Sequence, residues 1–307
     1  MDAFFAPAKL NLFLHVTGRR ADGYHLLETV FQLIDFGDTV HLAVRTDGRI
    51  HRVNLLAGIP EADDLSIRAA QLLKSETGCT LGVDIEIEKR IPAGGGLGGG
   101  SSDAATVLLA LNRLWNLGLT RAHLMQLGLK LGADVPFFIF GRNAFATGVG
   151  EELQGVELPS HSFVVIKPQA EVPTAAIFGS PELTRNAKSV KIADFSAGVL
   201  MGRLAAGQNA NQTGVSAGDS AFAAPAFRND LEAVAKAQFP AVEVALEWLR
   251  RHDAGAVIQA RMTGSGACVF AGFREHHDAE AVLMQRPAFL SGFVARGLSR
   301  HPLADFA

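Results

Sequence analysis

Near the N-terminus, apolar and polar residues alternate along the chain. The apolar positions are Leu10, Leu12, Leu14 and Val16, and the positions between them are Lys9, Asn11, Phe13 and His15. A period of two is typical of a β-strand that buries one face, so we predict a strand over residues 8–16. Lys9 and Asn11 then share the face that points away from the core.

Further stretches predict both strands and helices. Alternating or β-branched apolar runs predict strands at residues 29–36, 39–44, 81–87, 137–140, 144–147, 162–166 and around Phe293. Apolar residues at helical spacing predict helices at residues 66–73, 120–132, 230–237, 241–251 and 278–284. A further hairpin-like pair of strands flanks residues 263–266. Because strands and helices mix in both halves, we expect an α+β architecture.

A glycine-rich segment, Gly94–Gly100, follows the strand predicted at 81–87. Six of the 32 glycines in the chain fall within these seven positions. Ser101 and Ser102 come next, where a helix N-cap belongs, and residues 104–115 continue with helical spacing. Glycines let backbone N–H groups approach an anion, and the start of a helix adds the positive end of its dipole. The segment therefore predicts a phosphate-binding loop.

Two common phosphate-binding motifs do not fit this loop. A Walker loop requires Lys and then Ser or Thr after its last glycine, but Ser101 and Ser102 stand there. Gly94, Gly96 and Gly99 satisfy the dinucleotide fingerprint, which also needs an acidic residue about 20 positions later. Residues 104–133 contain neither Asp nor Glu, so a third type of nucleotide loop remains.

The composition is that of a globular protein with a sizeable core. Of the 307 residues, 48% are hydrophobic and 19% are charged, which excludes disorder and suggests two domains or one large one. Lys plus Arg is 28 against 31 for Asp plus Glu, with no Lys/Arg-rich run, so we expect no nucleic-acid partner. We expect no membrane partner, because no run approaches the ~18 apolar residues of a membrane span.

Two cysteines, Cys79 and Cys268, are too few and too far apart for a disulfide framework or a cysteine-based zinc site. Residues 1–10 lack the basic start and long apolar centre of a signal peptide. We therefore expect a cytoplasmic protein. Between about residues 205 and 226 nearly every residue is small or polar, and we predict a flexible surface insertion there, with no function assigned.

Five motifs, in the same order along the chain, resemble those of the GHMP kinases, the superfamily of galactokinase, homoserine kinase and mevalonate kinase. Residues 92–105 are similar to the superfamily's P-x-x-x-G-L-G-S-S-A-A loop. The other four motifs are residues 6–12, 20–25, 131–137 and 263–270. Together they resemble the branch that phosphorylates a CDP-linked polyol in the non-mevalonate route to isoprenoids.

The resemblance implies an ATP-dependent kinase that transfers the γ-phosphoryl group directly to a hydroxyl of the polyol. It implies a ribosomal-protein-S5-like N-terminal domain and a ferredoxin-like C-terminal domain with the site in the cleft between them. We place these domains at residues 1–155 and 156–307. ATP with Mg2+ is the implied cofactor, the CDP-linked polyol is the partner, and the chain is a monomer or homodimer. The pattern identifies no metal ligand.

By the same resemblance, Lys9 and Asp134 are the catalytic residues. A kinase acting on an alcohol needs a carboxylate near the hydroxyl to accept or orient its proton, and Asp134 takes that role. Lys9 would lie beside Asp134 and offset charge that develops on the transferred phosphoryl group. Without the resemblance, Asp134 also fits a turn or cap, and Lys9 an ordinary solvated lysine.

The resemblance also assigns binding residues. Those for ATP are Asp64, Lys89, Pro92, Ala93, Gly94, Gly95, Gly96, Leu97, Gly98, Gly99, Gly100, Ser101 and Ser102. Those for the substrate are Asn11, Tyr24, His25, Thr174, Phe178, Thr263, Gly264, Ser265 and Gly266. Tyr24 and His25 would pack on one face of the cytidine base and Phe178 on the other. Asp64 departs from the pattern, because an asparagine is expected at its position.

Two other functions compete with this interpretation. A GHMP kinase with a smaller alcohol substrate would give no reason for the pair Tyr24 and His25. A nucleotide-binding regulator without turnover would keep the glycine loop but would not need Asp134.

Overall fold

The computed structural model describes residues 1–190 and 227–307; the insertion predicted at 205–226 lies outside these residues. The strands are β1 (Asp2–Arg19), β2 (His25–Arg45), β3 (Ile50–Arg52), β4 (Gly82–Glu88), β5 (Ala144–Thr147), β6 (Glu152–Gly155), β7 (Ser162–Lys167), β8 (Ile258–Met262), β9 (Val269–Phe273) and β10 (Ser291–Leu298). The helices are the 3-10 turn η1 (Glu61–Asp63), α1 (Leu65–Thr77), α2 (Gly99–Leu114), α3 (Arg121–Leu131), α4 (Val135–Phe140), α5 (Thr174–Gly179), α8 (Glu232–Gln238), α9 (Pro240–Arg250) and α10 (His276–Met284). None of the described helices is long and apolar enough to cross a membrane.

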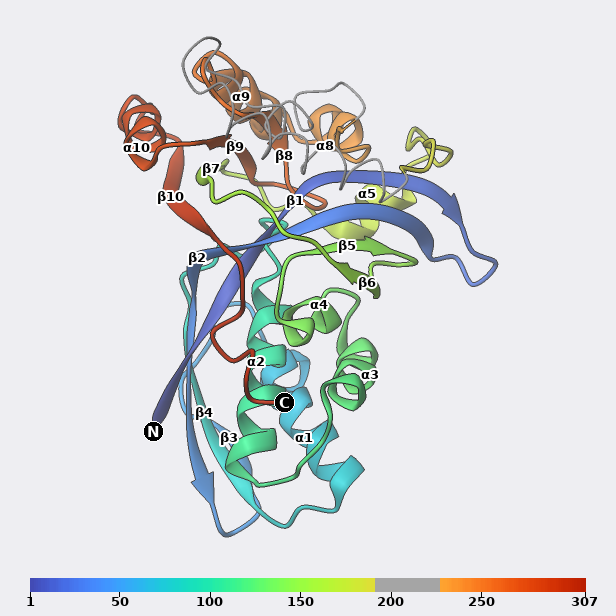
Figure 1. Cartoon of the computed structure of the whole chain (residues 1–307), viewed down its shortest axis with the longest axis vertical. Helices are drawn as coiled ribbons and strands as arrows, with labels where there is room; N and C mark the ends of the chain where they lie inside the picture. The colour runs from blue at the N-terminus through green and yellow to red at the C-terminus, as the bar shows by residue number, and fades with distance from the viewer. Residues whose placement is uncertain (191–226) are drawn as a thin grey trace, which may run out of the picture.

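Two long antiparallel strands, β1 and β2, run through both halves of the molecule (Figure 1). β2 is one strand where the sequence predicted two, because the chain continues past Gly37 through an irregularity in the pairing with β1. A Cβ atom on Gly37 would lie 2.3 Å from the carbonyl oxygen of Ala6, so only glycine fits this close crossing.

The prediction that β1 buries a single face is wrong. Lys9 and Asn11 are 3% and 2% exposed, and the intervening Phe13 is also buried. One face of β1 packs into the apolar core, whereas Lys9 and Asn11 line a cavity. A strand covered on both faces has to find internal partners for its polar side chains.

The strands form a single mixed sheet. Its order is β3, β4, β2, β10, β7, β9 and β8, with β1 and β5 also paired to β2 and β6 paired to β5. β10 bonds both to β2 and to β7, and so joins the N-terminal strands to the C-terminal ones. The strands predicted at 81–87, 144–147, 162–166 and around Phe293 are confirmed as β4, β5, β7 and β10.

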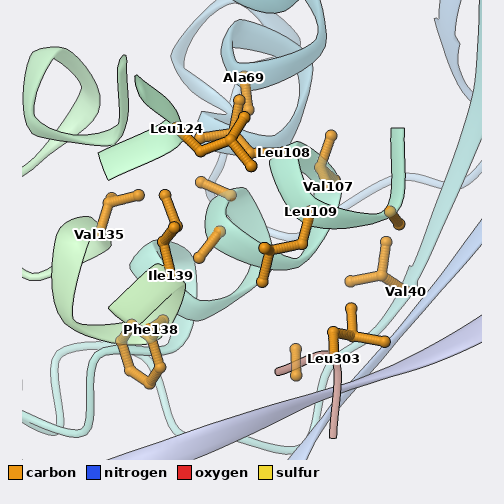
Figure 2. Close-up of a cluster of buried hydrophobic side chains, with 14 of the residues drawn as sticks. Val40, Ala69, Val107, Leu108, Leu109, Leu124, Val135, Phe138, Ile139 and Leu303 are labelled. Atoms are coloured by element: carbon orange, nitrogen blue, oxygen red, sulfur yellow. The ribbon is translucent and has the colours of Figure 1, made fainter. Parts of the chain in front are cut away.

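Helices cover the sheet as two separate groups, each with its own core (Figure 1). In the first core, α1–α4 pack against the sheet, and Figure 2 shows Leu108, Leu124 and Ile139 meeting from three of these helices. In the second, α8–α10 pack on β7, β8 and β9. Leu303, near the C-terminus, returns to the first core. We propose residues 1–155 and 156–307 as the two domains, with this returning tail as an exception.

The helices predicted at 66–73, 120–132, 230–237, 241–251 and 278–284 are confirmed as α1, α3, α8, α9 and α10. The strand predicted at 137–140 is wrong: these residues form α4, which has Pro136 in its first turn. α4 is buried on nearly all sides, so its short apolar run has no polar face to reveal the helical period.

The start of α2 also differs from the prediction. Its N-cap is Gly98, in the left-handed region at φ 75°, and Ser101 and Ser102 lie inside the first turn instead of capping it. The Ser102 hydroxyl donates to the carbonyl of Pro7, 2.7 Å away, and so ties the helix to β1. The glycine loop and the helix therefore overlap by two residues.

Candidate active site

A cavity of about 1060 Å³ opens between the two helix groups. β1, the turn after it, the start of α1, the glycine loop, α5 and the turn 264–266 all contribute lining residues. Every residue assigned to the site from the sequence lines this one cavity except Ser102 and Thr263. Segments that are far apart in the chain thus meet where the sequence predicted a shared site.

The glycine loop is fixed from both halves of the molecule. Lys9 N–H donates to the carbonyl of Leu97 at 3.0 Å, and Ala267 N–H donates to the carbonyl of Gly94 at 2.9 Å. A Cβ on Gly96 would lie 2.2 Å from the carbonyl oxygen of Thr263, so the loop and the 263–266 turn touch backbone to backbone. The loop is therefore held in one shape before any ligand arrives.

The start of α2 leaves an anion site on the cavity wall. No side chain caps this helix end, and the first N–H groups of any helix lack acceptors within the helix. Gly99, Gly100 and Ser101 in its first turn all line the cavity. These amides and the positive end of the helix dipole suit a phosphate group.

Lys9 and Asp134 meet at the cavity wall. Lys9 Nζ lies 3.3 Å from Asp134 Oδ2; the lysine side chain is 4% exposed and that of the aspartate 33%. Asp134 precedes α4, but its carboxylate makes no capping hydrogen bond to that helix. The capping interpretation of Asp134 therefore has no support, and the carboxylate is open to the cavity.

A chain of hydrogen bonds orients Lys9. Its Nζ donates to Asn11 Oδ1 at 2.5 Å, and Asn11 Nδ2 donates to Thr29 Oγ1 at 2.9 Å. The Thr29 hydroxyl in turn donates to the carbonyl of Phe13. Asn11 lines the cavity, and its amide has a second N–H besides the one that bonds Thr29, so its predicted bond to the substrate stays a prediction.

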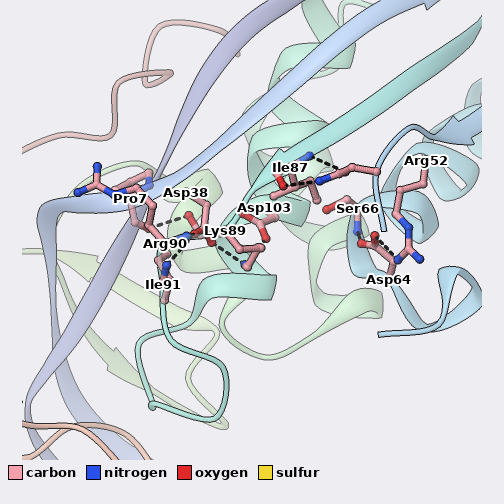
Figure 3. A network of polar contacts seen from close by, with 12 residues as sticks. Pro7, Asp38, Arg52, Asp64, Ser66, Ile87, Lys89, Arg90, Ile91 and Asp103 are labelled. Atoms are coloured by element: carbon pink, nitrogen blue, oxygen red, sulfur yellow. Dashed lines mark hydrogen bonds and ion pairs between the residues drawn. The ribbon is translucent and has the colours of Figure 1, made fainter. Parts of the chain in front are cut away.

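A cluster of charges, two buried aspartates around the partly exposed Lys89, lies next to the glycine loop (Figure 3). Lys89 Nζ lies 2.5 Å from Asp38 Oδ2 and 2.7 Å from Asp103 Oδ2. Asp38 Oδ1 accepts from the backbone N–H groups of Arg90 and Ile91, which lead into the loop. The cluster thus joins β2, the end of β4 and α2 at the base of the predicted phosphate site.

The charged groups in this cluster shift one another's pKa values. Burial raises the pKa of Asp103 to about 7, against the opposing effect of Lys89. Burial alone would lower the pKa of Lys89, but Asp103 and Asp38 raise it. Lys89 therefore stays a cation, and it offsets carboxylate charge that would otherwise repel a phosphate.

Asp64 has a comparable internal role at the other side of the loop (Figure 3). It accepts from Ser66 N–H as the N-cap of α1 and lies 3.3 Å from Arg52. Asp64 and Lys89 both line the cavity, so their assignment to ATP stays a prediction. Each also has a structural task that the sequence did not indicate.

At the far end of the cavity, aromatic side chains gather. Tyr24 is 62% exposed, while His25 and Phe178 contact each other with ring centroids 5.0 Å apart. In this arrangement a base cannot lie between His25 and Phe178, because these two rings already touch. The stacking roles predicted for Tyr24, His25 and Phe178 therefore stay predictions, and a base between His25 and Phe178 requires these two rings to separate.

The 263–266 turn reaches the cavity only in part. Gly264, Ser265 and Gly266 line it, and Ser265 shares a 2.8 Å hydrogen bond with Thr174 of α5. Thr263 is fully buried and accepts from Asn11 N–H at 2.9 Å. Thr263 therefore braces β1 rather than lining the cavity.

Three further residues were missed by sequence reasoning: Asp38, Asp103 and Arg185. Asp38 pairs with a lysine 51 positions away, a contact created by the pairing of β2 with β4, in which Thr39 lies opposite Glu88. Asp103 was visible within the glycine motif, directly after Ser102, and its acidic side chain in an apolar helix was the available signal. Arg185 bonds His25 and leaves no local pattern.

No group of three or more His, Cys, Asp or Glu side chains suitable for a metal ion occurs within residues 1–190 and 227–307. The cavity does offer single oxygen donors, since Asp134 and Ser101 both line it. Such a donor set fits a cation that arrives with phosphate groups, as Mg2+ does, better than a dedicated metal cage.

Two regions of the chain match known protein families. Residues 64–142 match the family described as GHMP kinases N terminal domain, and residues 210–291 match GHMP kinases C terminal. The first match contains the glycine loop and Asp134, and the second contains the 263–266 turn.

Individual proteins are similar over nearly the whole chain. A 4-diphosphocytidyl-2-C-methyl-D-erythritol kinase of Ralstonia pickettii (strain 12J) is 56% identical over 302 residues, covering 98% of this chain and 96% of that protein. A crystal structure of 4-(cytidine 5'-diphospho)-2C-methyl-D-erythritol kinase is 34% identical, with TM-score 0.77, covering 96% of this chain and 99% of that one. A crystal structure of homoserine kinase from Cytophaga hutchinsonii is 19% identical, with TM-score 0.64, and covers 98% of this chain and 96% of that one. It therefore shares the fold.

Proposed function

The chain belongs to the GHMP kinases and, within them, to the 4-diphosphocytidyl-2-C-methyl-D-erythritol kinases, and we propose that its cavity holds ATP and the CDP-linked polyol together. It has the two-domain α+β fold of that superfamily. It catalyses ATP-dependent phosphorylation of the 2-hydroxyl of 4-diphosphocytidyl-2-C-methyl-D-erythritol, giving the 2-phosphate and ADP, a step in non-mevalonate isoprenoid precursor biosynthesis.

The observation that carries the assignment of residues is the pair Lys9 and Asp134 on the same cavity as the glycine loop. In the proposed step, the substrate hydroxyl oxygen forms a bond to the γ-phosphorus while the bond to the β,γ-bridging oxygen breaks. The hydroxyl proton passes to the Asp134 carboxylate, and the electron pair of the broken bond leaves with ADP. Lys9 stabilises the charge shared by the transferred group and its attacking oxygen.

The phosphates of ATP would lie on Gly94–Ser101. There the amides at the start of α2 point to the cavity, and the charge of Lys89 stands behind them. The cytidine base would lie at the aromatic end, against Tyr24 and Phe178.

We propose that Mg2+ enters with ATP and is held mainly by its phosphates, with Ser101 as an oxygen donor of the cavity wall. The bound ion would neutralise phosphate charge. Chelation by EDTA should remove turnover, and restored Mg2+ should return it.

We further propose that the protein works in the cytoplasm, as a monomer or homodimer without nucleic acid. Light scattering of the purified protein decides its oligomeric state.

An acceptor panel tests the function. ATP consumption is measured with the CDP-linked polyol, homoserine, mevalonate and galactose as acceptors. Turnover with the CDP-linked polyol alone is expected. Turnover of homoserine or mevalonate without the CDP-linked polyol would overturn the substrate assignment, and no turnover with any acceptor would favour a nucleotide-binding regulator.

A further inference from the structure

Arg185 makes a direct hydrogen bond to His25 at the aromatic end of the cavity. Its Nε lies 3.0 Å from His25 Nε2. The same guanidinium donates to the backbone carbonyls of Phe178, Ser180 and Leu183, at 3.0, 2.7 and 3.0 Å. One side chain thus ties the imidazole of His25 to the segment that carries the Phe178 ring. His25 and Phe178 both line the cavity.

The chemistry of this bond fixes the state of the imidazole. A guanidinium has N–H donors and no acceptor, so His25 Nε2 has to accept. An imidazole with an accepting Nε2 is neutral and carries its single hydrogen on Nδ1. Within the described residues, His25 Nδ1 makes no hydrogen bond, and His25 lines the cavity. The polar group that the ring offers to a ligand is therefore an N–H donor.

We propose that Arg185 is a positioning residue for substrate specificity, which holds His25 as the neutral Nδ1–H tautomer so that the cavity presents a donor to the base of the nucleotide. This inference rests on the proposed function, since it requires a nucleotide base at the aromatic end. Cytosine has an unprotonated ring nitrogen at N3, which accepts a hydrogen bond. Uracil carries a hydrogen on N3, so two donors would face each other there.

The charges around His25 all favour the neutral ring. Arg185 approaches from the segment after α5, and Arg19 lies opposite His25 in the β1–β2 pairing. Burial, then Arg185, then Arg19 lower the pKa of His25 below its usual value. The nearest acid in the turn, Asp22, is paired with Arg20 at 2.7 Å. A neutral His25 keeps its donor through the physiological range.

The wild-type protein gives the first test without any turnover. Nitrogen-15 NMR of the histidine rings, with His25 assigned by its loss in His25→Asn, reports the tautomer and its titration. We expect a neutral ring with hydrogen on Nδ1 at pH 7, which gains a proton only below pH 6.5. A ring with hydrogen on Nε2, or an imidazolium at pH 7, would overturn the proposal.

Variants and simple nucleotides give the second test. In Arg185→Met the Nε2–H tautomer should become populated, and the preference for CDP over UDP as competitive inhibitors should fall about fivefold, as for one lost hydrogen bond. kcat at saturating substrate should stay unchanged. Arg286→Met removes an exposed positive charge that does not line the cavity, and it should leave both the tautomer and the preference unchanged.

Different results would overturn the proposed kinase function and the proposed role of Arg185. An unaltered CDP preference in folded Arg185→Met would overturn the specificity role even if the kinase assay succeeds. If neither CDP nor UDP binds, base recognition at this end is overturned, and the ring spectrum still decides whether Arg185 fixes His25. Should Arg185→Met not fold, the wild-type spectrum alone decides that point.

Discussion

The two ends of the cavity are built differently. At the phosphate end, Lys9, Asp38 and Asp103 are each buried and each has a polar partner: Lys9 donates to Asn11, and both aspartates pair with Lys89. At the base end, Tyr24 is mostly exposed and makes no aromatic contact with the neighbouring rings in the described part of the chain. Buried charged groups therefore fix the phosphate end, whereas aromatic rings form the surface of the base end.

The difference follows from what each end has to do. Stabilising charge in a transition state requires groups that already point at the reacting atoms, because reorienting them would cost the energy that they supply. Stacking a base requires only a planar surface and tolerates small displacements. Changes at the phosphate end should therefore affect stability and kcat, and changes at the base end should affect KM.

The largest effect is expected for Asp38→Asn. Oriented to keep both backbone hydrogen bonds, the amide would turn its NH2 group toward Lys89 Nζ, so two donors would meet in a buried site. Breaking one partner of a fully buried ion pair costs about 3 to 5 kcal/mol. Because the Lys89 side chain is 28% exposed, we expect a loss near the lower end of that range in the free energy of unfolding by urea. Asp47→Asn, at an exposed pair with Arg45, is the control and should change much less. Equal losses would show that burial of the cluster is irrelevant.

The next effect is expected for Lys9→Met. The long apolar side chain keeps the volume but removes the cation beside Asp134, so kcat should fall about 10²- to 10³-fold with little change in KM for either substrate. Steady-state kinetics measure both constants. Lys130→Met, at an exposed lysine on α3, should retain full activity. A Lys9 variant that loses only affinity would move Lys9 from the reacting atoms to ground-state binding.

Substitution of two glycines allows the cost of backbone strain to be measured apart from the cost of close packing. Gly98 and Gly118 both have positive φ, 75° and 66°, but a Cβ on Gly98 would lie 2.9 Å from the Phe138 ring and 3.2 Å from Lys9 Cε. Nothing lies within 4 Å of a Cβ on Gly118. Gly98→Ala should lose about 1 to 3 kcal/mol more stability than Gly118→Ala and should raise KM for ATP. Matching losses in thermal unfolding would mean that the loop has room to relax.

The smallest effect is expected for Tyr24→Ala. Its exposed ring supports no core, so Tm should stay unchanged. Loss of one of two stacking partners should weaken base binding by about 1 kcal/mol, which raises KM for the CDP-linked polyol about fivefold at constant kcat. Phe289→Ala removes a similarly exposed aromatic ring that does not line the cavity, and its kinetics should match the wild type. A fall in kcat for Tyr24→Ala would contradict the expectation that changes at the base end affect KM alone.

The sequence predicted most of the cavity because its residues lie in short local motifs. The glycine loop, the β1 residues Lys9 and Asn11 and the segment around Asp134 each carry a recognisable pattern, and the fold brings these patterns together. Their roles stay predictions until variants are measured. Most helices and the shorter strands were also predicted in the right places, whereas β1 runs from Asp2 to Arg19, well beyond the predicted residues 8–16.

Features that depend on distant contacts could not be predicted. Asp38 joins the phosphate end because β2 pairs with β4, which places Asp38 beside Lys89. α4 was mistaken for a strand, since a short element buried on nearly all sides shows no periodicity. The serines after the loop looked like caps, whereas the left-handed Gly98 already starts the helix. In each case tertiary packing decided what local preference could not.

Turnover by Asp134→Asn tests the central claim most directly. The amide has the same shape as the carboxylate but cannot accept the hydroxyl proton, and it removes no capping bond. We expect kcat for formation of the 2-phosphate to fall about 10²- to 10⁴-fold, while Tm and the Kd for ATP stay at wild-type values. Near-native kcat in a folded Asp134→Asn enzyme would remove Asp134 from the role of base and contradict the account of this cavity.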